Sequence, residues 1–117
     1  MQLTNKIIFS IERTERPAQQ HEIEAVAKRL DAKIVLGSYN NELEVSFIVD
    51  ADKRQDAQTM AALFNQESIL ILNDESADLY YLETGKIETI GSKMVKVDKK
   101  PLDGNYTLIG SDFYVVQ

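Results

Sequence analysis

Cysteine is absent from the 117 residues of this chain. Its absence excludes disulfide bonds, thiolate nucleophiles and thiolate metal sites, and it favours a reducing compartment. Long apolar runs are also absent, since no segment approaches the roughly 18 residues that span a bilayer. The N-terminal stretch MQLTNKIIFSIERTE has neither the charged leader nor the apolar run of a secretory signal. We therefore expect a cytoplasmic protein that does not bind membranes.

Histidine occurs once, and the common catalytic motifs do not occur at all. A Ser-His-Asp site would need His21 as its base and a Gly-x-Ser-x-Gly turn, which the sequence lacks, so His21 is expected on the surface. Calcium loops, phosphate loops and dinucleotide-binding turns are missing too. Glu42 and Glu44 could pair on one strand face, but a solvated charged face explains them as simply. The sequence thus predicts no catalytic residue, metal or cofactor.

Positive charge is scarce, and the formal net charge is -6. Direct binding to nucleic acid is therefore not expected, because such binding depends on clustered lysine and arginine side chains. The segment between positions 67 and 88 is rich in acidic residues: it contains six of them and only one basic residue, Lys86. These six acids are Glu67, Asp74, Glu75, Asp78, Glu83 and Glu88. A basic protein partner is the expectation that follows.

The hydrophobic pattern of residues 6 to 74 predicts alternating strands and helices. Strands are expected at 6–12, 32–40, 41–50 and 68–74, with a hairpin turn at Asn40 and Asn41, which tolerate a positive φ. A helix is expected at 18–31, and a second helix would begin at a capping box formed by Asp52 and Gln55. This order predicts an α+β fold with a ferredoxin-like β-α-β-β-α-β core.

Beyond residue 74 the sequence contains only strand-like segments separated by turns. Residues 78–117 are therefore expected to form an antiparallel meander that extends or flanks the core. We predict a single domain over residues 1–117, with a core at 6–74 and a C-terminal β extension at 78–117. The open edges of such a sheet would permit a homodimer or the addition of a partner's strand.

Two short motifs resemble an uncharacterised family of small bacterial α/β domains. The first is Glu44-Val45-Ser46-Phe47, similar to a Glu-x-Ser-Phe strand, and the second is Phe64-Asn65-Gln66, similar to a helix end that precedes an apolar strand. An Asn-Pro loop of that family corresponds here to Arg16-Pro17, so one of its two residues differs. The resemblance, over residues 9–82, implies a fold and a polar site around Glu44, Ser46 and Gln66, without a particular reaction.

The stretch RTERPAQQHE, residues 13–22, places two arginines before the first predicted helix. Pro17 suits the first helical position, which would put Arg16 at the cap, where it cannot accept the free N–H groups. Thr14 or Glu15 could fold back to accept them. Alternatively, an anion could bind there between Arg13 and Arg16, or the arginines could simply pair with neighbouring acids.

The function expected from these features is a non-catalytic protein-binding or regulatory module, and an inhibitor is one form of it. Its partner would contact an acidic surface that contains an exposed tyrosine, formed by Asp74, Glu75, Asp78, Tyr80, Tyr81 and Glu83. The alternative is a small-anion or small-ligand site at Arg13, Arg16, Glu44, Ser46 and Gln66. A small enzyme of unknown reaction ranks third.

Overall fold

A computed structural model describes residues 2–13 and 15–117 of the chain. Its two α-helices are α1 (Gln20–Leu30) and α2 (Arg54–Leu63), and a short 3-10 helix, η1 (Ala51–Lys53), precedes α2. The strands are β1 (Gln2–Leu3), β2 (Lys6–Ser10), β3 (Lys33–Tyr39), β4 (Glu42–Asp50), β5 (Ser68–Leu72), β6 (Ala77–Tyr81), β7 (Ile87–Gly91), β8 (Met94–Val97), β9 (Tyr106–Ile109) and β10 (Asp112–Val116). No helix in the described ranges is long and apolar enough to cross a membrane.

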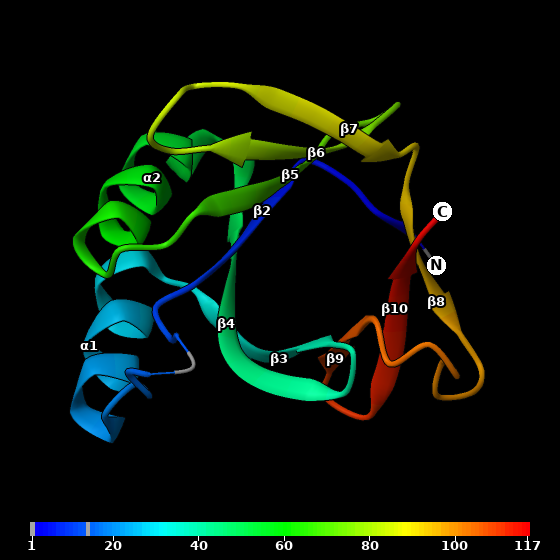
Figure 1. Cartoon of the computed structure of the whole chain (residues 1–117), viewed down its shortest axis with the longest axis horizontal. Coiled ribbons are helices and arrows are strands. Elements are labelled where there is room, and N and C mark those ends of the chain that lie inside the picture. Colours follow the sequence, from blue (N-terminus) through cyan, green and yellow to red (C-terminus); the bar gives the residue numbers. More distant parts are fainter. Residues whose placement is uncertain (1, 14) are drawn as a thin grey trace.

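In the described part of the chain, the strands form one ten-stranded sheet with the order β1-β8-β10-β9-β3-β4-β2-β5-β6-β7. All neighbouring strands in this sheet are antiparallel. The sheet curls into a nearly closed barrel, and both helices lie outside it, against the side formed by β2, β4 and β5 (Figure 1).

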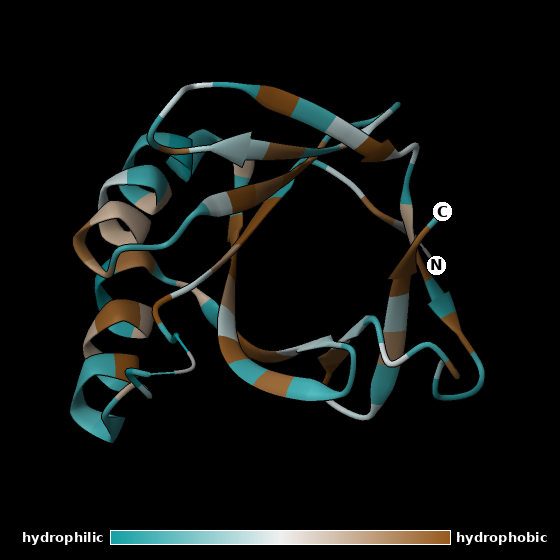
Figure 2. Ribbon diagram, viewed as in Figure 1, coloured by the Kyte–Doolittle hydropathy of each residue, from teal (hydrophilic) through white to brown (hydrophobic). Residues whose placement is uncertain are grey.

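Two separate cores follow from the alternation of side chains along the central strands. On β2, Ile7 and Phe9 face the helices, whereas Ile8 between them faces the barrel interior. On β4, Phe47 belongs to the helix-facing core and stacks on Phe9 with ring centroids 5.4 Å apart. The central strands therefore carry apolar side chains on both faces. Their ribbons are accordingly coloured largely brown (Figure 2).

The two halves of the sheet approach each other at Gly91, the last residue of β7. A Cβ atom on Gly91 would overlap with Val116 Cγ1 and would lie 2.8 Å from the Gln117 carbonyl oxygen. Next to it, the N–H of Ser92 donates to the Gln117 carbonyl at 2.7 Å, and the N–H of Gln117 donates to the Lys93 carbonyl at 2.8 Å. Only glycine allows this close contact, which brings the C-terminus against the β7–β8 turn.

The predicted ferredoxin-like α+β fold is wrong. The structure is mostly antiparallel sheet with two helices, and the C-terminal strands do not flank a separate core. Instead, β9 pairs with β3, and β8 and β10 continue the same curved sheet. The pattern of residues 6 to 74 indicated the helices and strands locally, but the curvature depends on contacts between residues far apart in the sequence.

Gly104 joins the β8–β9 connection to the β3–β4 hairpin, and we expect its substitution to destabilise the protein. Its φ is 75°, and a Cβ atom there would lie 2.6 Å from the Asn41 backbone nitrogen. Gly104→Ala should lower the free energy of unfolding by about 1–3 kcal/mol, measured by urea denaturation. Gly110→Ala is the control, because φ is also positive there but nothing lies within 4 Å. Equal losses for the two variants would contradict the proposed steric contact.

Candidate active site

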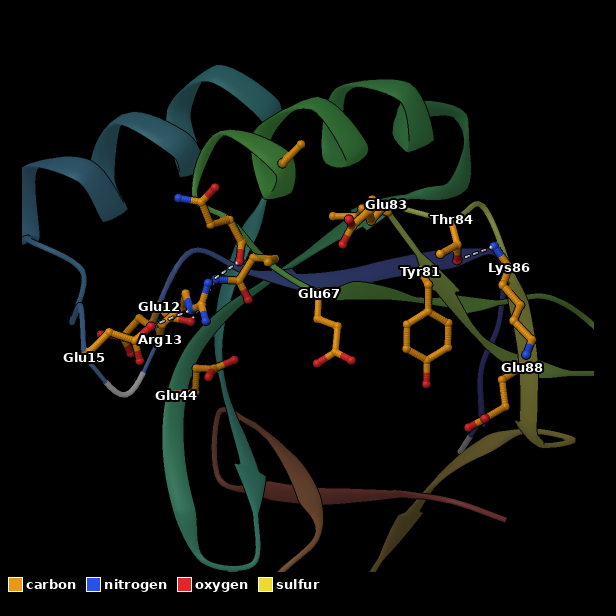
Figure 3. Close-up of a pocket in the computed structure, with 14 residues that line it drawn as sticks. Glu12, Arg13, Glu15, Glu44, Glu67, Tyr81, Glu83, Thr84, Lys86 and Glu88 are labelled. Atoms are coloured by element: carbon orange, nitrogen blue, oxygen red, sulfur yellow. Dashed lines mark hydrogen bonds and ion pairs between the residues drawn. The ribbon is translucent and has the colours of Figure 1, made fainter.

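A pocket of about 1080 Å³ opens beside the helices, where several loops meet the ends of β4 and β6. Its wall is formed by the segment between β2 and α1, the α2–β5 connection and the β6–β7 turn (Figure 3). Six of the lining residues are glutamates, against one arginine and one lysine. The glutamates are Glu12, Glu15, Glu44, Glu67, Glu83 and Glu88, and the basic residues are Arg13 and Lys86. Such an excess of carboxylates in a concave site attracts cations.

Glu44, on β4, is the pocket carboxylate whose surroundings change its acidity most clearly. Burial raises the pKa of Glu44 above its ordinary value, the Ser10 hydroxyl lowers it, and the negative charge of Glu12 raises it again. Glu44 also lines a smaller cavity of about 230 Å³ that adjoins the pocket and contains Ser46 and Gln66. A half-buried carboxylate of this kind is poorly screened by water, so its attraction for a cation is stronger than at the surface.

Tyr81, at the end of β6, points into the same open space as Glu44 and Glu67 (Figure 3). Its pKa is raised by burial and by the negative charges of Glu88 and Glu67, so its hydroxyl keeps its proton at neutral pH. The aromatic ring is part of the wall, and the face of a tyrosine ring attracts cations. The pocket therefore combines carboxylates with an aromatic surface.

The predicted ligand-binding residues separate into two groups in the structure. Arg13, Glu44, Ser46 and Gln66 line the pocket or the adjoining smaller cavity. Arg16 does not line these cavities, because its guanidinium pairs with Glu22 Oε2 at 2.7 Å and lies over the Phe64 ring, 5.0 Å from its centroid. The structure thus brings four of the five together.

The start of α1 has its own hydrogen-bond acceptors and does not support the predicted anion site. Glu12 Oε2 accepts the N–H of Ala18 at 2.8 Å, and Glu22 Oε1 accepts the N–H of Gln19 at 3.0 Å. The helix begins at Gln20 rather than at Pro17, and Arg13 and Arg16 form a tight backbone bridge before it. Thr14, which we considered as a cap, lies outside the described residues, and Glu15 pairs with Arg13 at 2.9 Å. His21 is exposed on α1, as predicted.

The residues predicted to bind a partner do not form one surface. Tyr81 and Glu83 line the pocket, whereas Asp74 and Glu75 are exposed in the β5–β6 turn. Two others are engaged within the protein: Asp78 accepts hydrogen bonds from Thr89 and Ser76, and Tyr80 packs on the helix-facing core with the Arg54 guanidinium over its ring. Binding of a basic protein partner stays a prediction.

Sequence reasoning did not select Glu67 and Glu88 as site residues. The signal was present, since both belong to the acidic stretch of residues 67–88 and Glu67 directly follows Gln66. We interpreted that stretch as an outer surface, whereas the β6–β7 hairpin places Glu83 and Glu88 opposite Glu44 around the pocket (Figure 3). No group of three or more histidine, aspartate or glutamate side chains in the described residues is arranged to hold a metal ion.

Comparison with known families gives one result for this chain. The model of the S-adenosylmethionine lyase family matches residues 10–117, which is most of the sequence and includes the whole pocket. No curated protein and no solved structure matches. The family match indicates an enzyme, so the prediction of a non-catalytic regulatory or inhibitory module is wrong, and the alternative of an anion-binding domain is not favoured either.

Proposed function

Because the chain belongs to the S-adenosylmethionine lyase family, we propose that it binds S-adenosylmethionine in the acidic pocket and cleaves a carbon–sulfur bond of this substrate. The observation that supports this proposal most directly is the excess of carboxylates around Tyr81. S-adenosylmethionine carries a positive charge on its sulfonium sulfur and a second one on its amino group. A pocket with six glutamates complements both charges.

In this proposal, the sulfonium group lies between the Glu44 carboxylate and the ring of Tyr81. A carboxylate in partial burial attracts the cation with little screening, and an aromatic face adds a cation–π contact. Lys86 is the proposed partner of the substrate carboxylate. The side chain of Lys86 has no ion pair in the described part of the chain, whereas Arg13 already contacts Glu15 and the Asn65 carbonyl.

The chemistry requires little from an acid group of the protein. In the proposed step, the substrate's own carboxylate forms a new carbon–oxygen bond to the carbon of the amino acid chain that carries the sulfonium, and the carbon–sulfur bond of this carbon breaks. The sulfur keeps the electron pair and leaves as a neutral thioether, and the amino acid part closes to a lactone, so neither a proton nor water is consumed. The contribution of the pocket is then to hold the substrate in one reactive conformation and to exclude water from it, which are effects of positioning and desolvation.

The proposed reaction can be tested with purified protein and S-adenosylmethionine alone, without a methyl acceptor. We expect the substrate to disappear and a thioether product to accumulate in equal amount, as measured by liquid chromatography and mass spectrometry. The neutral thioether S-adenosylhomocysteine is the matched control ligand, and calorimetry should show much weaker binding of it, because it lacks the sulfonium charge. An unchanged amount of S-adenosylmethionine after long incubation would overturn the proposal.

The pH dependence of the reaction should follow the ionisation of Glu44. Only its carboxylate form attracts the sulfonium, so kcat/KM should fall as the pH is lowered through the raised pKa of Glu44 and should be constant above it. We expect this fall at a higher pH than an exposed glutamate would give, because burial raises the pKa of Glu44. A value of kcat/KM that does not fall as the pH is lowered would contradict the assigned role of Glu44.

A cytoplasmic location is also part of the proposal. The cysteine-free composition suits a reducing compartment.

In the sheet of the described residues, β1 and β7 are the edge strands. Pairing of two copies of the chain through such an edge stays a prediction.

A further inference from the structure

Glu12 connects four segments of the chain around the pocket. Its carboxylate accepts the N–H of Val45 on β4 through Oε1 at 2.6 Å, and the N–H of Ala18 before α1 through Oε2 at 2.8 Å. Its own carbonyl accepts a hydrogen bond from Gln66 Nε2 at 2.8 Å, and its N–H donates to Ser10 Oγ at 3.0 Å. Both carboxylate oxygens are thus occupied by backbone donors.

The position of Glu12 explains why these bonds are needed. The ladder between β2 and β4 ends at the pair Ser10–Ser46, so Val45 is the first residue of β4 without a β2 partner. Glu12 accepts the N–H of Val45, and Ser10 Oγ donates to the Val45 carbonyl at 2.6 Å. The two side chains replace the missing strand and satisfy backbone groups that would otherwise be unpaired next to the core.

We propose that Glu12 is a positioning residue, which holds the backbone of β4 where the ladder ends and thereby keeps the carboxylate of the adjacent Glu44 directed into the pocket. This inference rests on the proposed function, because it gives Glu12 a role in the same site. In this role Glu12 acts on the reaction through Glu44, because each of its two carboxylate oxygens already accepts a backbone N–H group.

A second effect of Glu12 is electrostatic and acts in addition to the geometry. Burial is the largest cause of the raised pKa of Glu44. The Ser10 hydroxyl lowers this pKa, and the negative charge of Glu12 raises it further. The other charged or titratable side chains around the pocket are Arg13, Glu15, Glu67, Tyr81, Glu83, Lys86 and Glu88. Removal of the charge of Glu12 should therefore move the titration of Glu44 to lower pH.

The first experiment measures this titration directly and needs no enzymatic activity. Carbon NMR of labelled glutamate carboxyls should show the midpoint of Glu44 at lower pH in Glu12→Gln than in the wild type. Glu22→Gln is the matched control, because Glu22 also binds a backbone N–H but is absent from the groups that affect Glu44. An identical Glu44 midpoint in the wild type and Glu12→Gln would overturn the electrostatic effect of Glu12 on Glu44.

The second experiment tests whether Glu12 acts through Glu44. Glu12→Gln should lower kcat/KM by about 10-fold to 100-fold, the usual result of misplacing a reacting group. In the Glu44→Gln background, the same substitution should have almost no further effect, and additive losses would overturn the inference. Failure of the wild type to cleave the substrate would refute only the proposed reaction, and the NMR titration would still decide whether the charge of Glu12 acts on Glu44.

A second variant keeps the test decisive if Glu12→Gln does not fold. Glu12→Asp retains the charge, but its side chain is one methylene shorter and cannot reach both N–H groups. We expect Glu44 to titrate near its wild-type midpoint in this variant while kcat/KM falls. An unchanged kcat/KM in folded Glu12→Asp would show that positioning by Glu12 is not needed.

Discussion

Substitution of Glu44 by glutamine is expected to reduce kcat/KM for S-adenosylmethionine by about 100-fold or more. The change removes one negative charge while it keeps the size of the side chain. Loss of one partner of a desolvated charge pair costs about 2–5 kcal/mol, and each 1.4 kcal/mol corresponds to a factor of ten. Glu44 lies in partial burial with a raised pKa, so its charge is less screened than those of its exposed neighbours.

The measurement for Glu44→Gln is the initial rate over a range of substrate concentrations, which separates KM from kcat. We expect most of the loss in KM, because the attraction to the sulfonium is present in the bound substrate as well as in the transition state. Glu75→Gln makes the same chemical change at an exposed position outside the pocket and should leave the kinetics unaltered. A Glu44→Gln rate within twofold of the wild type would refute the assignment of Glu44 to the substrate site.

The local elements of this fold could be predicted because their signals lie within a few residues of each other. Asn40 and Asn41 were expected at a hairpin turn, and both have positive φ between β3 and β4. The apolar spacing that predicted a helix at 18–31 is present in α1. The helix begins at Gln20, however, two residues later than predicted. The reason is Glu12, whose carboxylate binds the N–H of Ala18 and holds the preceding segment outside the helix.

The overall architecture could not be predicted in the same way. The sheet curls because β9 pairs with β3, and the C-terminus reaches the β7–β8 turn through the contact at Gly91. These contacts join residues that are 24 to 72 positions apart, and no local pattern encodes them. An order of strands and helices is compatible with more than one arrangement of the sheet, so the preference for a common fold led to the wrong architecture.

In the candidate site, too, residues within short sequence motifs could be predicted, whereas residues that only the fold brings to the pocket could not. Glu44, Ser46 and Gln66 were selected because two short motifs resemble a known pattern, and the structure places all three at the pocket or the adjoining smaller cavity. Glu67 and Glu88 were not selected, because their acidity was interpreted as that of an outer surface. Only the folding of the β6–β7 hairpin toward β4 shows that these charges surround a cavity.

The pocket depends on the layer of helices, since α2 and its connection to β5 form one of its walls. This layer is held by the core around Phe47, a residue with no exposed surface whose ring stacks on that of Phe9. Phe47 lies three positions after Glu44 on the same strand, so the stability of this core and the geometry of the pocket are linked.

Phe47→Ala is therefore expected to lower the free energy of unfolding by about 3–5 kcal/mol, the usual cost of truncating a buried phenylalanine. This loss is a large part of the roughly 5–15 kcal/mol that stabilise a domain, so binding of S-adenosylmethionine should weaken as well. Urea denaturation followed by circular dichroism provides the measurement. Leu43→Ala, on the same strand but 59% exposed, should change the stability by less than about 0.5 kcal/mol. If the two substitutions had similar small effects, the helices would not be held by the core that surrounds Phe47.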